Sequence, residues 1–208
     1  NTAGWNNTPV DVVFTGTDAV SGIEYCSSSF TITGEGMGIP VSGYCADYAG
    51  WTSTVSFSVN IDTTAPSSNA EITAEHGLNG WLMSPAGITL ISTDSLSGVA
   101  ALYYSVDGSS FALYSSSFAV SGEGAHLLKY YSVDRAGNRE TEKELAFKLD
   151  LNAPLAGADS RPVANNHGWN NTAVSVVFSG TDTMSGVAYC EPAKIVDIEG
   201  SSRAVTGY

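Results

Sequence analysis

An internal repeat is the feature that most constrains the fold of this chain. Three segments align without gaps: GWNNTPVDVVFTGTDAVSGIEYC from Gly4, GWLMSPAGITLISTDSLSGVAAL from Gly80 and GWNNTAVSVVFSGTDTMSGVAYC from Gly168. Each has a Trp after the first Gly and an Asp thirteen residues after that Trp. Because self-similarity of this kind marks one structural unit used repeatedly, the sequence predicts several similar domains in series.

A second alignment covers the later half of each unit. GYCADYAG from Gly43 matches YYSVDRAGN from Tyr130, and VNIDTTAP from Val59 matches FKLDLNAP from Phe147. The two Ala-Pro pairs lie 88 residues apart, which places repeat boundaries near Thr64 and Asn152. We therefore predict a first repeat (1–64) that lacks its first strand, a complete middle repeat (65–152) and a third repeat (153–208) that lacks its last strands.

Short alternating runs separated by turn residues indicate the fold class. Large apolar side chains recur at every second position in 10–14, 55–61 and 145–149, and Asp107-Gly108 between two β-rich runs predicts a tight turn. No window shows helical spacing over three turns. We predict an all-β fold of tandem immunoglobulin-like antiparallel β-sandwich domains, without a helix longer than about two turns.

The chain has three cysteines, and in a secreted protein an odd count calls for a missing partner. Cys26 and Cys45 lie in one repeat, so we predict a disulfide between them, with reduced buried thiols as the alternative. Cys190 aligns with Cys26, and Tyr208 aligns with Tyr44. We therefore expect Cys190 to pair with a cysteine beyond the fragment. A disulfide indicates an oxidising compartment.

Composition and charge exclude several functions. A net charge of −13 repels nucleic acid and anionic lipid, and no apolar run is long enough to span a membrane. His76, His126 and His167 show no catalytic or metal-ligand spacing, and we expect His76 and His167 in exposed loops. The sequence predicts a protein that is not an enzyme.

Recurring aspartates form the one set of residues that suggests ligand binding. They occupy three kinds of position: the start of the T-D-x-x-S-G turn, the start of the D-x-A-G turn, and the end of the last strand before Ala-Pro. The set comprises Asp18, Asp47, Asp62, Asp94, Asp134, Asp150 and Asp182. Carboxylates gathered at a junction suit calcium, whereas an Asp in a turn also caps its own backbone amides, and both interpretations stay open. We expect Asp62 to lie near the loops of Asp94 or Asp134, and Asp150 to be placed likewise toward the third repeat.

The repeated tryptophans and two sequons allow a functional and a structural interpretation. Trp5, Trp81 and Trp169 are candidate sugar-stacking platforms, but recurrence beside Gly favours packing at equivalent places. Asn6 and Asn170 head N-N-T sequons and are candidate glycosylation sites, although they also suit turns.

The combined motifs GTDxxSG, D-x-A-G-N and I-D-x-x-A-P resemble the bacterial immunoglobulin-like repeats of large surface adhesins and giant extracellular proteins. The middle repeat also resembles the related outer-membrane-protein β-repeat. The resemblance covers essentially the whole chain. It implies a non-enzymatic stalk, adhesin rod or surface filament located outside the cell, with calcium at the junctions as a stiffening device.

Two other functions compete with this one. In the first alternative, the domains are accessory modules that attach a secreted enzyme to polysaccharide. In the second, the chain is a filament subunit whose incomplete repeat is completed by strands from another chain. We favour an excerpt of a longer chain. The expected partners are neighbouring repeats of the same or identical chains, with a surface glycan or host protein as the adhesion ligand.

Overall fold

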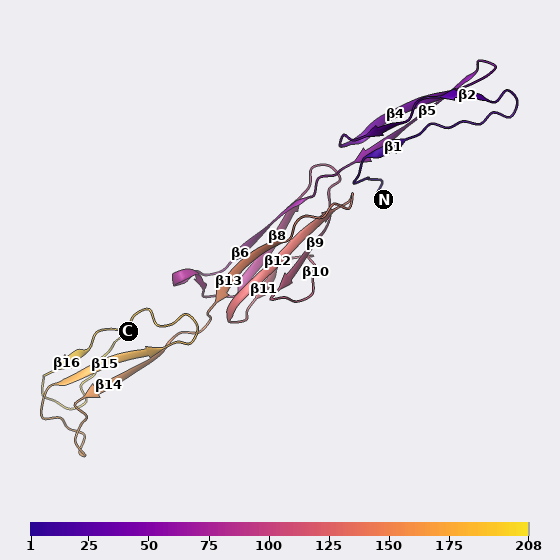
Figure 1. Cartoon of the computed structure of the whole chain (residues 1–208). Helices are drawn as coiled ribbons and strands as arrows, with labels where there is room; N and C mark the ends of the chain where they lie inside the picture. Colours follow the sequence, from indigo (N-terminus) through magenta and orange to yellow (C-terminus); the bar gives the residue numbers. More distant parts are fainter. Residues whose placement is uncertain (208) are drawn as a thin grey trace. The chain divides into compact units, whose positions relative to one another are not determined.

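The computed structural model describes residues 1–207, which form strands and connecting loops (Figure 1). Helical structure in these residues is limited to the short 3₁₀ helix η1 (Leu78–Gly80). The prediction of an all-β fold is therefore confirmed. Among the same residues, none of the helical structure is long and apolar enough to cross a membrane.

The chain divides into two compact units, which we describe separately. The first comprises Asn1–Thr73, Gly87–Ala119 and His126–Ala146. The second comprises Ala74–Ala86, Val120–Ala125 and the described residues from Phe147 onward. The repeat boundaries near Thr64 and Asn152 remain a prediction from the sequence.

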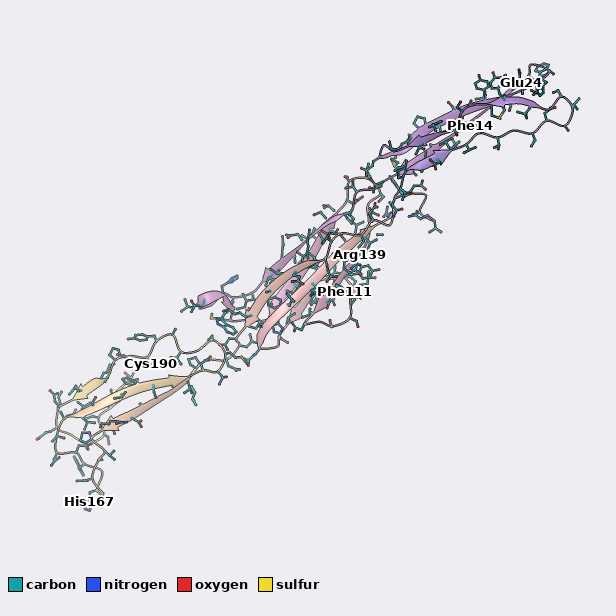
Figure 2. The ribbon with its side chains drawn as sticks, in the orientation of Figure 1. Phe14, Glu24, Phe111, Arg139, His167 and Cys190 are labelled. Atoms are coloured by element: carbon teal, nitrogen blue, oxygen red, sulfur yellow. A yellow bond between two sulfur atoms is a disulfide. The ribbon has the colours of Figure 1, made fainter. Side chains whose placement is uncertain are left out.

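The first five strands belong to the first unit and form two antiparallel sheets. They are β1 (Val10–Val12), β2 (Ile23–Cys26), β3 (Phe30–Ile32), β4 (Gly36–Asp47) and β5 (Thr52–Ile61). Strand β1 pairs with β3, and the other sheet has the order β2-β4-β5. Their buried core is Val12, Phe14 and Val41, and Phe14 is marked in Figure 2.

The middle repeat supplies two further sheets. Its strands are β6 (Ser67–Thr73), β7 (Trp81–Leu82), β8 (Ala86–Thr93), β9 (Val99–Val106), β10 (Ala112–Leu113), β11 (Phe118–Val120), β12 (Gly124–Asp134) and β13 (Lys143–Leu149). One sheet has the order β11-β8-β6, and the other contains β10-β9-β12-β13. Strand β6 pairs with β8 from Ser67↔Thr93 to Thr73↔Gly87.

Alternation along β12 positions the middle core. Leu128, Tyr130, Ser132 and Asp134 are buried, while the residues between them are partly exposed. This is the period of two that places successive side chains on opposite faces of a strand. The predicted turn at Asp107-Gly108 is confirmed, because both residues have positive φ and Ser109 N–H donates to the Val106 carbonyl at 3.1 Å.

The second unit contains one parallel pair and one antiparallel sheet. The end of β13 runs parallel to β7, with Lys148 opposite Trp81 and Leu149 opposite Leu82, so the pairing is not antiparallel throughout. Strands β14 (Leu155–Arg161), β15 (Val174–Thr181) and β16 (Lys194–Val196) form a sheet in that order. The same parallel pairing occurs in the first unit as a bridge between Asn6 and Ile61.

Candidate functional site

The linker after β5 is held by the loop that follows β8. Asp62 is completely buried, and its Oδ2 accepts a hydrogen bond from Ser97 N–H at 2.9 Å. Its Oδ1 accepts from Thr64 N–H at 3.1 Å, as expected for an Asx turn. One carboxylate therefore caps its own linker and binds the T-D-x-x-S-G turn of the middle repeat.

A second loop of the middle repeat holds the same linker through an amide side chain. Asn138 Nδ2 donates to the Asp62 carbonyl at 2.7 Å and to Asp134 Oδ2 at 2.7 Å. Asp134 Oδ1 accepts from the N–H groups of Gly137 and Asn138. The D-x-A-G-N turn is thereby fixed and presents Asn138 to the linker.

Asp62, Asp94 and Asp134 form a cluster of three carboxylates. One oxygen of each lies within 4.8 Å of the other two, and Asp62 and Asp134 are buried. At an effective dielectric of about 20, two such charges repel by roughly 3 kcal/mol. Backbone N–H groups and Asn138 offset part of this repulsion. The prediction that Asp62 lies near the loops of Asp94 or Asp134 is correct.

The cluster fits a hard cation in the chemistry of its donors. All three ligands are carboxylate oxygens, which calcium prefers, but calcium takes six to eight oxygens in total. Asp62, Asp94 and Asp134 would supply three of these, and carbonyls or water would supply the rest.

The linker is also held from its own side. Glu35, in the loop between β3 and β4, accepts from Thr63 N–H at 2.7 Å and from the hydroxyl groups of Thr63 and Thr64. These donors, the Thr63 hydroxyl first, lower the pKa of Glu35. The linker is therefore clamped between a carboxylate of the repeat it leaves and the loops of the repeat it enters.

The linker after β13 shows the same arrangement. Asp150 Oδ2 accepts from Ser185 N–H at 3.0 Å, and Asp150 Oδ1 accepts from Asn152 N–H at 3.2 Å. Hydrogen bonding from Ser185, followed by the Asn152 amide, lowers the pKa of Asp150. On the other side, Glu123 Oε1 accepts from Leu151 N–H at 3.2 Å and from Asn152 Nδ2 at 2.5 Å.

Sequence reasoning missed the two glutamates of these clamps. A signal was present, since Gly34-Glu35-Gly36 recurs as Gly122-Glu123-Gly124 at the same 88-residue spacing as the Ala-Pro pairs. A Glu flanked by two glycines is also typical of an ordinary turn, so this repeated pattern alone does not predict a contact with the linker.

The remaining candidate aspartates cap turns. Asp18 Oδ1 accepts from the amides of Val20, Ser21 and Gly22, and these bonds, that of Gly22 first, lower its pKa. Asp182 Oδ1 accepts from the amides of Met184 and Gly186. Asp47 Oδ1 accepts from Trp51 N–H at 2.8 Å.

The predicted disulfide between Cys26 and Cys45 is confirmed. The two residues are directly opposite in β2 and β4 and are covalently bonded. Cys190 is a free, partly buried thiol within the described residues (Figure 2).

The repeated tryptophans differ in burial. Trp5 is buried, Trp81 is half-buried with Lys148 Nζ 4.7 Å from its ring centroid, and Trp169 is 55% exposed. In the first two repeats the Trp immediately precedes the residue that pairs in parallel with the terminal strand, Asn6 or Leu82. This position favours a packing role for Trp5 and Trp81.

An aromatic group lies on β9 and β12. Tyr103 and Tyr131 stack with centroids 5.2 Å apart, and the Arg139 guanidinium lies 3.8 Å from the Tyr131 ring centroid. Phe111 meets Tyr131 edge-on; Phe111 and Arg139 are both marked in Figure 2. The Tyr131 ring therefore packs against Tyr103, Phe111 and Arg139.

The sequons and histidines occupy different environments. Asn6 is half-buried and its Nδ2 donates to the Asn60 carbonyl at 3.1 Å, whereas Asn170 is exposed. His76 and His167 are exposed, as expected. His126 is largely buried, with Nδ1 2.7 Å from Asp107 Oδ2. The Leu127 amide and then His126 lower the pKa of Asp107.

The chain matches no protein-family model, and no curated protein sequence matches it significantly.

Proposed function

We propose that this chain is a non-enzymatic structural segment of a long extracellular protein, in which tandem immunoglobulin-like repeats act as a stalk, adhesin rod or filament. Short Ala-Pro linkers resist bending because proline restricts the residue before it. Each repeat then contributes length, and neighbouring repeats are its main partners. The disulfide supports an oxidising location.

The clamped linker is the observation that carries this proposal. Asp62 and Asp150 occupy aligned positions and receive N–H hydrogen bonds from Ser97 and Ser185, which are also aligned. A flexible tether needs no buried carboxylate at its start, whereas a mechanical joint must resist rotation. The recurrence therefore supports load transmission from one repeat to the next.

Calcium belongs to the same proposal as a second stabilising element. The carboxylates of Asp62, Asp94 and Asp134 lie close enough to share one cation, which would offset their repulsion and stiffen the joint.

The test is the rigidity of the chain after the clamp is removed. Asp62→Ala and Asp150→Ala should broaden the distribution of end-to-end distances measured between spin labels in the first and third repeats. Asp159→Ala, which changes an exposed carboxylate in β14, is the matched control. Equal distance distributions for all variants would contradict a mechanical role of the linkers.

A further inference from the structure

The first repeat carries a pair of exposed tyrosines beside its disulfide. Tyr25 immediately precedes Cys26 in β2. Tyr44 immediately precedes Cys45 in β4. Tyr25 is opposite Ala46, two residues beyond Tyr44, so both tyrosine side chains lie on the same face of the sheet. This face is open to solvent, since the two tyrosines are 47% and 41% exposed.

The two phenol groups contact each other directly. Their hydroxyl oxygens lie 3.2 Å apart in a hydrogen bond, and their rings meet edge to face with centroids 5.7 Å apart. The hydrogen bond with Tyr44 is the main cause of the raised pKa of Tyr25, so Tyr25 keeps its hydroxyl hydrogen at neutral pH. The disulfide and the hydrogen bonds between Ser27 and the Tyr44 backbone hold the two strands in register.

The tyrosine pair and the cysteine pair vary together among the repeats. Tyr25-Cys26 recurs in the third repeat as Tyr189-Cys190, and Tyr208, which lies outside the described residues, aligns with Tyr44. In the middle repeat Ala101-Leu102 stands at the aligned position, so the tyrosine pair is missing where the disulfide is also missing. This co-occurrence favours a shared role of the two pairs in joining the strands.

We propose that Tyr25 and Tyr44 are a site of oxidative cross-linking, at which a carbon–carbon bond between the two rings joins β2 to β4. The oxidant is hydrogen peroxide used by a haem peroxidase. Each phenol loses its hydroxyl hydrogen atom, and these two hydrogen atoms reduce one hydrogen peroxide to two waters. The two phenoxyl radicals couple at the ring carbons next to the hydroxyl groups. The hydrogen on each of these carbons then moves to the oxygen, which restores both phenols.

Proximity and exposure together select this pair. Two phenoxyl radicals couple only when their rings meet, and the edge-to-face contact already holds one ring against the other. A peroxidase acts at the protein surface, so the reacting rings must also be exposed. Tyr103 and Tyr131 of the middle repeat are as close, with centroids 5.2 Å apart, but both are half-buried and Tyr131 also packs against Phe111 and Arg139.

The cross-link depends on the proposed function only for its oxidant, because an extracellular location exposes the tyrosines to peroxide. The geometry of the pair lies within the first repeat and does not involve the linkers. The new bond differs from the disulfide because thiols do not cleave it. Strands β2 and β4 therefore stay joined under reducing conditions.

The experiment treats the full chain at micromolar concentration with hydrogen peroxide and a haem peroxidase. The products are then reduced, alkylated and cut with a protease specific for glutamate, which cleaves after Glu35, between the two tyrosines. We expect the fragments that contain Tyr25 and Tyr44 to stay joined, to lack the mass of two hydrogen atoms and to show the blue fluorescence of bityrosine. Fragments that separate after reduction would overturn the inference.

Conservative substitutions test which residues form the bond. Tyr25→Phe and Tyr44→Phe each remove one hydroxyl and keep the ring, and either should abolish the joined fragments while the disulfide still forms. Tyr48→Phe, at a residue that is 71% exposed, should leave the yield unchanged. Joined fragments that persist in Tyr25→Phe, or a bond that forms between Tyr103 and Tyr131 instead, would contradict the assignment.

Hydrogen exchange under reducing conditions tests the consequence of the bond. With dithiothreitol present, the amides of β2 and β4 should exchange more slowly in the cross-linked chain than in the chain that was not oxidised, and equal exchange would reject a role in joining the strands. Asp62→Ala should leave the yield of the cross-link unchanged. Absence of the cross-link, while Asp62→Ala still loosens the chain, would reject the tyrosine site and leave the proposed function standing.

Discussion

The first and middle repeats hold aligned strands together by different chemistry. Cys26 and Cys45 are opposite one another in β2 and β4 and are joined by a disulfide. At the aligned positions of β9 and β12, Leu102 is opposite Ser132, and no covalent bond is possible. The middle repeat instead uses a buried carboxylate.

Glu140 is the centre of that network. Its oxygens accept from Ser68 N–H at 2.9 Å, from the Ser68 hydroxyl at 2.5 Å and from the Ser132 hydroxyl at 2.9 Å. Lys143 Nζ lies 2.5 Å from Glu140 Oε1. Burial by itself raises the pKa of Glu140, but Lys143 and the serine donors outweigh it, so the net shift is downward.

The two solutions constrain different parts of a sandwich. The disulfide ties neighbouring strands of one sheet and limits the unfolded chain, while Glu140 ties β12 to β6, which belongs to another sheet. The comparison shows that the middle repeat, which lacks the disulfide, joins its two sheets through the charged hydrogen-bond network of Glu140. Two sets of substitutions, a change of calcium concentration and a change of pH test this difference.

Removing the carboxylate should have the largest effect. Glu140→Ala leaves the donors of Ser68 and Ser132 and the Lys143 ammonium without their acceptor, and we expect a loss of about 3–5 kcal/mol in the free energy of unfolding. Urea denaturation measures this loss. Glu142→Ala, at a partly exposed carboxylate, is the control and should cost less than about 1 kcal/mol. Equal costs would show that Glu140 is not a structural link.

Removing the disulfide should destabilise the first repeat by a slightly smaller amount. Cys26 and Cys45 enclose a sequence separation of 19 residues, for which loop-closure entropy gives roughly 3 kcal/mol. Cys26→Ser combined with Cys45→Ser should accelerate hydrogen exchange in β2 and β4 more than in β12. Cys190→Ser is the control. Equal acceleration in β12 would mean that the two repeats do not stabilise themselves separately.

Calcium should act on the linker rather than on either network. With free calcium at about ten times its Kd, binding would stabilise the folded chain by about 1.4 kcal/mol. Thermal unfolding in calcium and in chelator measures this shift, and Asp94→Asn should reduce it while Asp11→Asn should not. Identical melting temperatures in both buffers would identify the aspartates as backbone caps only.

Acid should weaken the Glu140 network but not the disulfide. We expect its effect on the free energy of unfolding to be the smallest of the four. Because the pKa of Glu140 is lower in the folded chain than in the unfolded one, its contribution is complete above the unfolded value of about 4.3 and disappears as pH falls through the folded value. The stability difference between the natural chain and Glu140→Gln should therefore shrink below about pH 4. A constant difference across this range would contradict the assignment.

The sequence by itself determined the strands, the cysteine pair and the approach of Asp62 to the next repeat. The alternation of apolar side chains predicts which of them face inward. The aligned repeats place Cys26 and Cys45 in one repeat and locate both Ala-Pro linkers. These signals are local or repeated, so they can be recognised in the sequence without knowing which strands pair.

Only the tertiary structure decided which polar groups meet. Glu140 and Ser68 are 72 residues apart, and Glu35 reaches a linker 28 residues away. Both bonds depend on how sheets and loops pack. The local sequence around a loop carboxylate looks the same whether the carboxylate is solvated or hydrogen-bonded. The periodicity of a strand carries no information on the partner of a polar side chain, since that partner is chosen by three-dimensional proximity and by the need to satisfy each buried donor and acceptor.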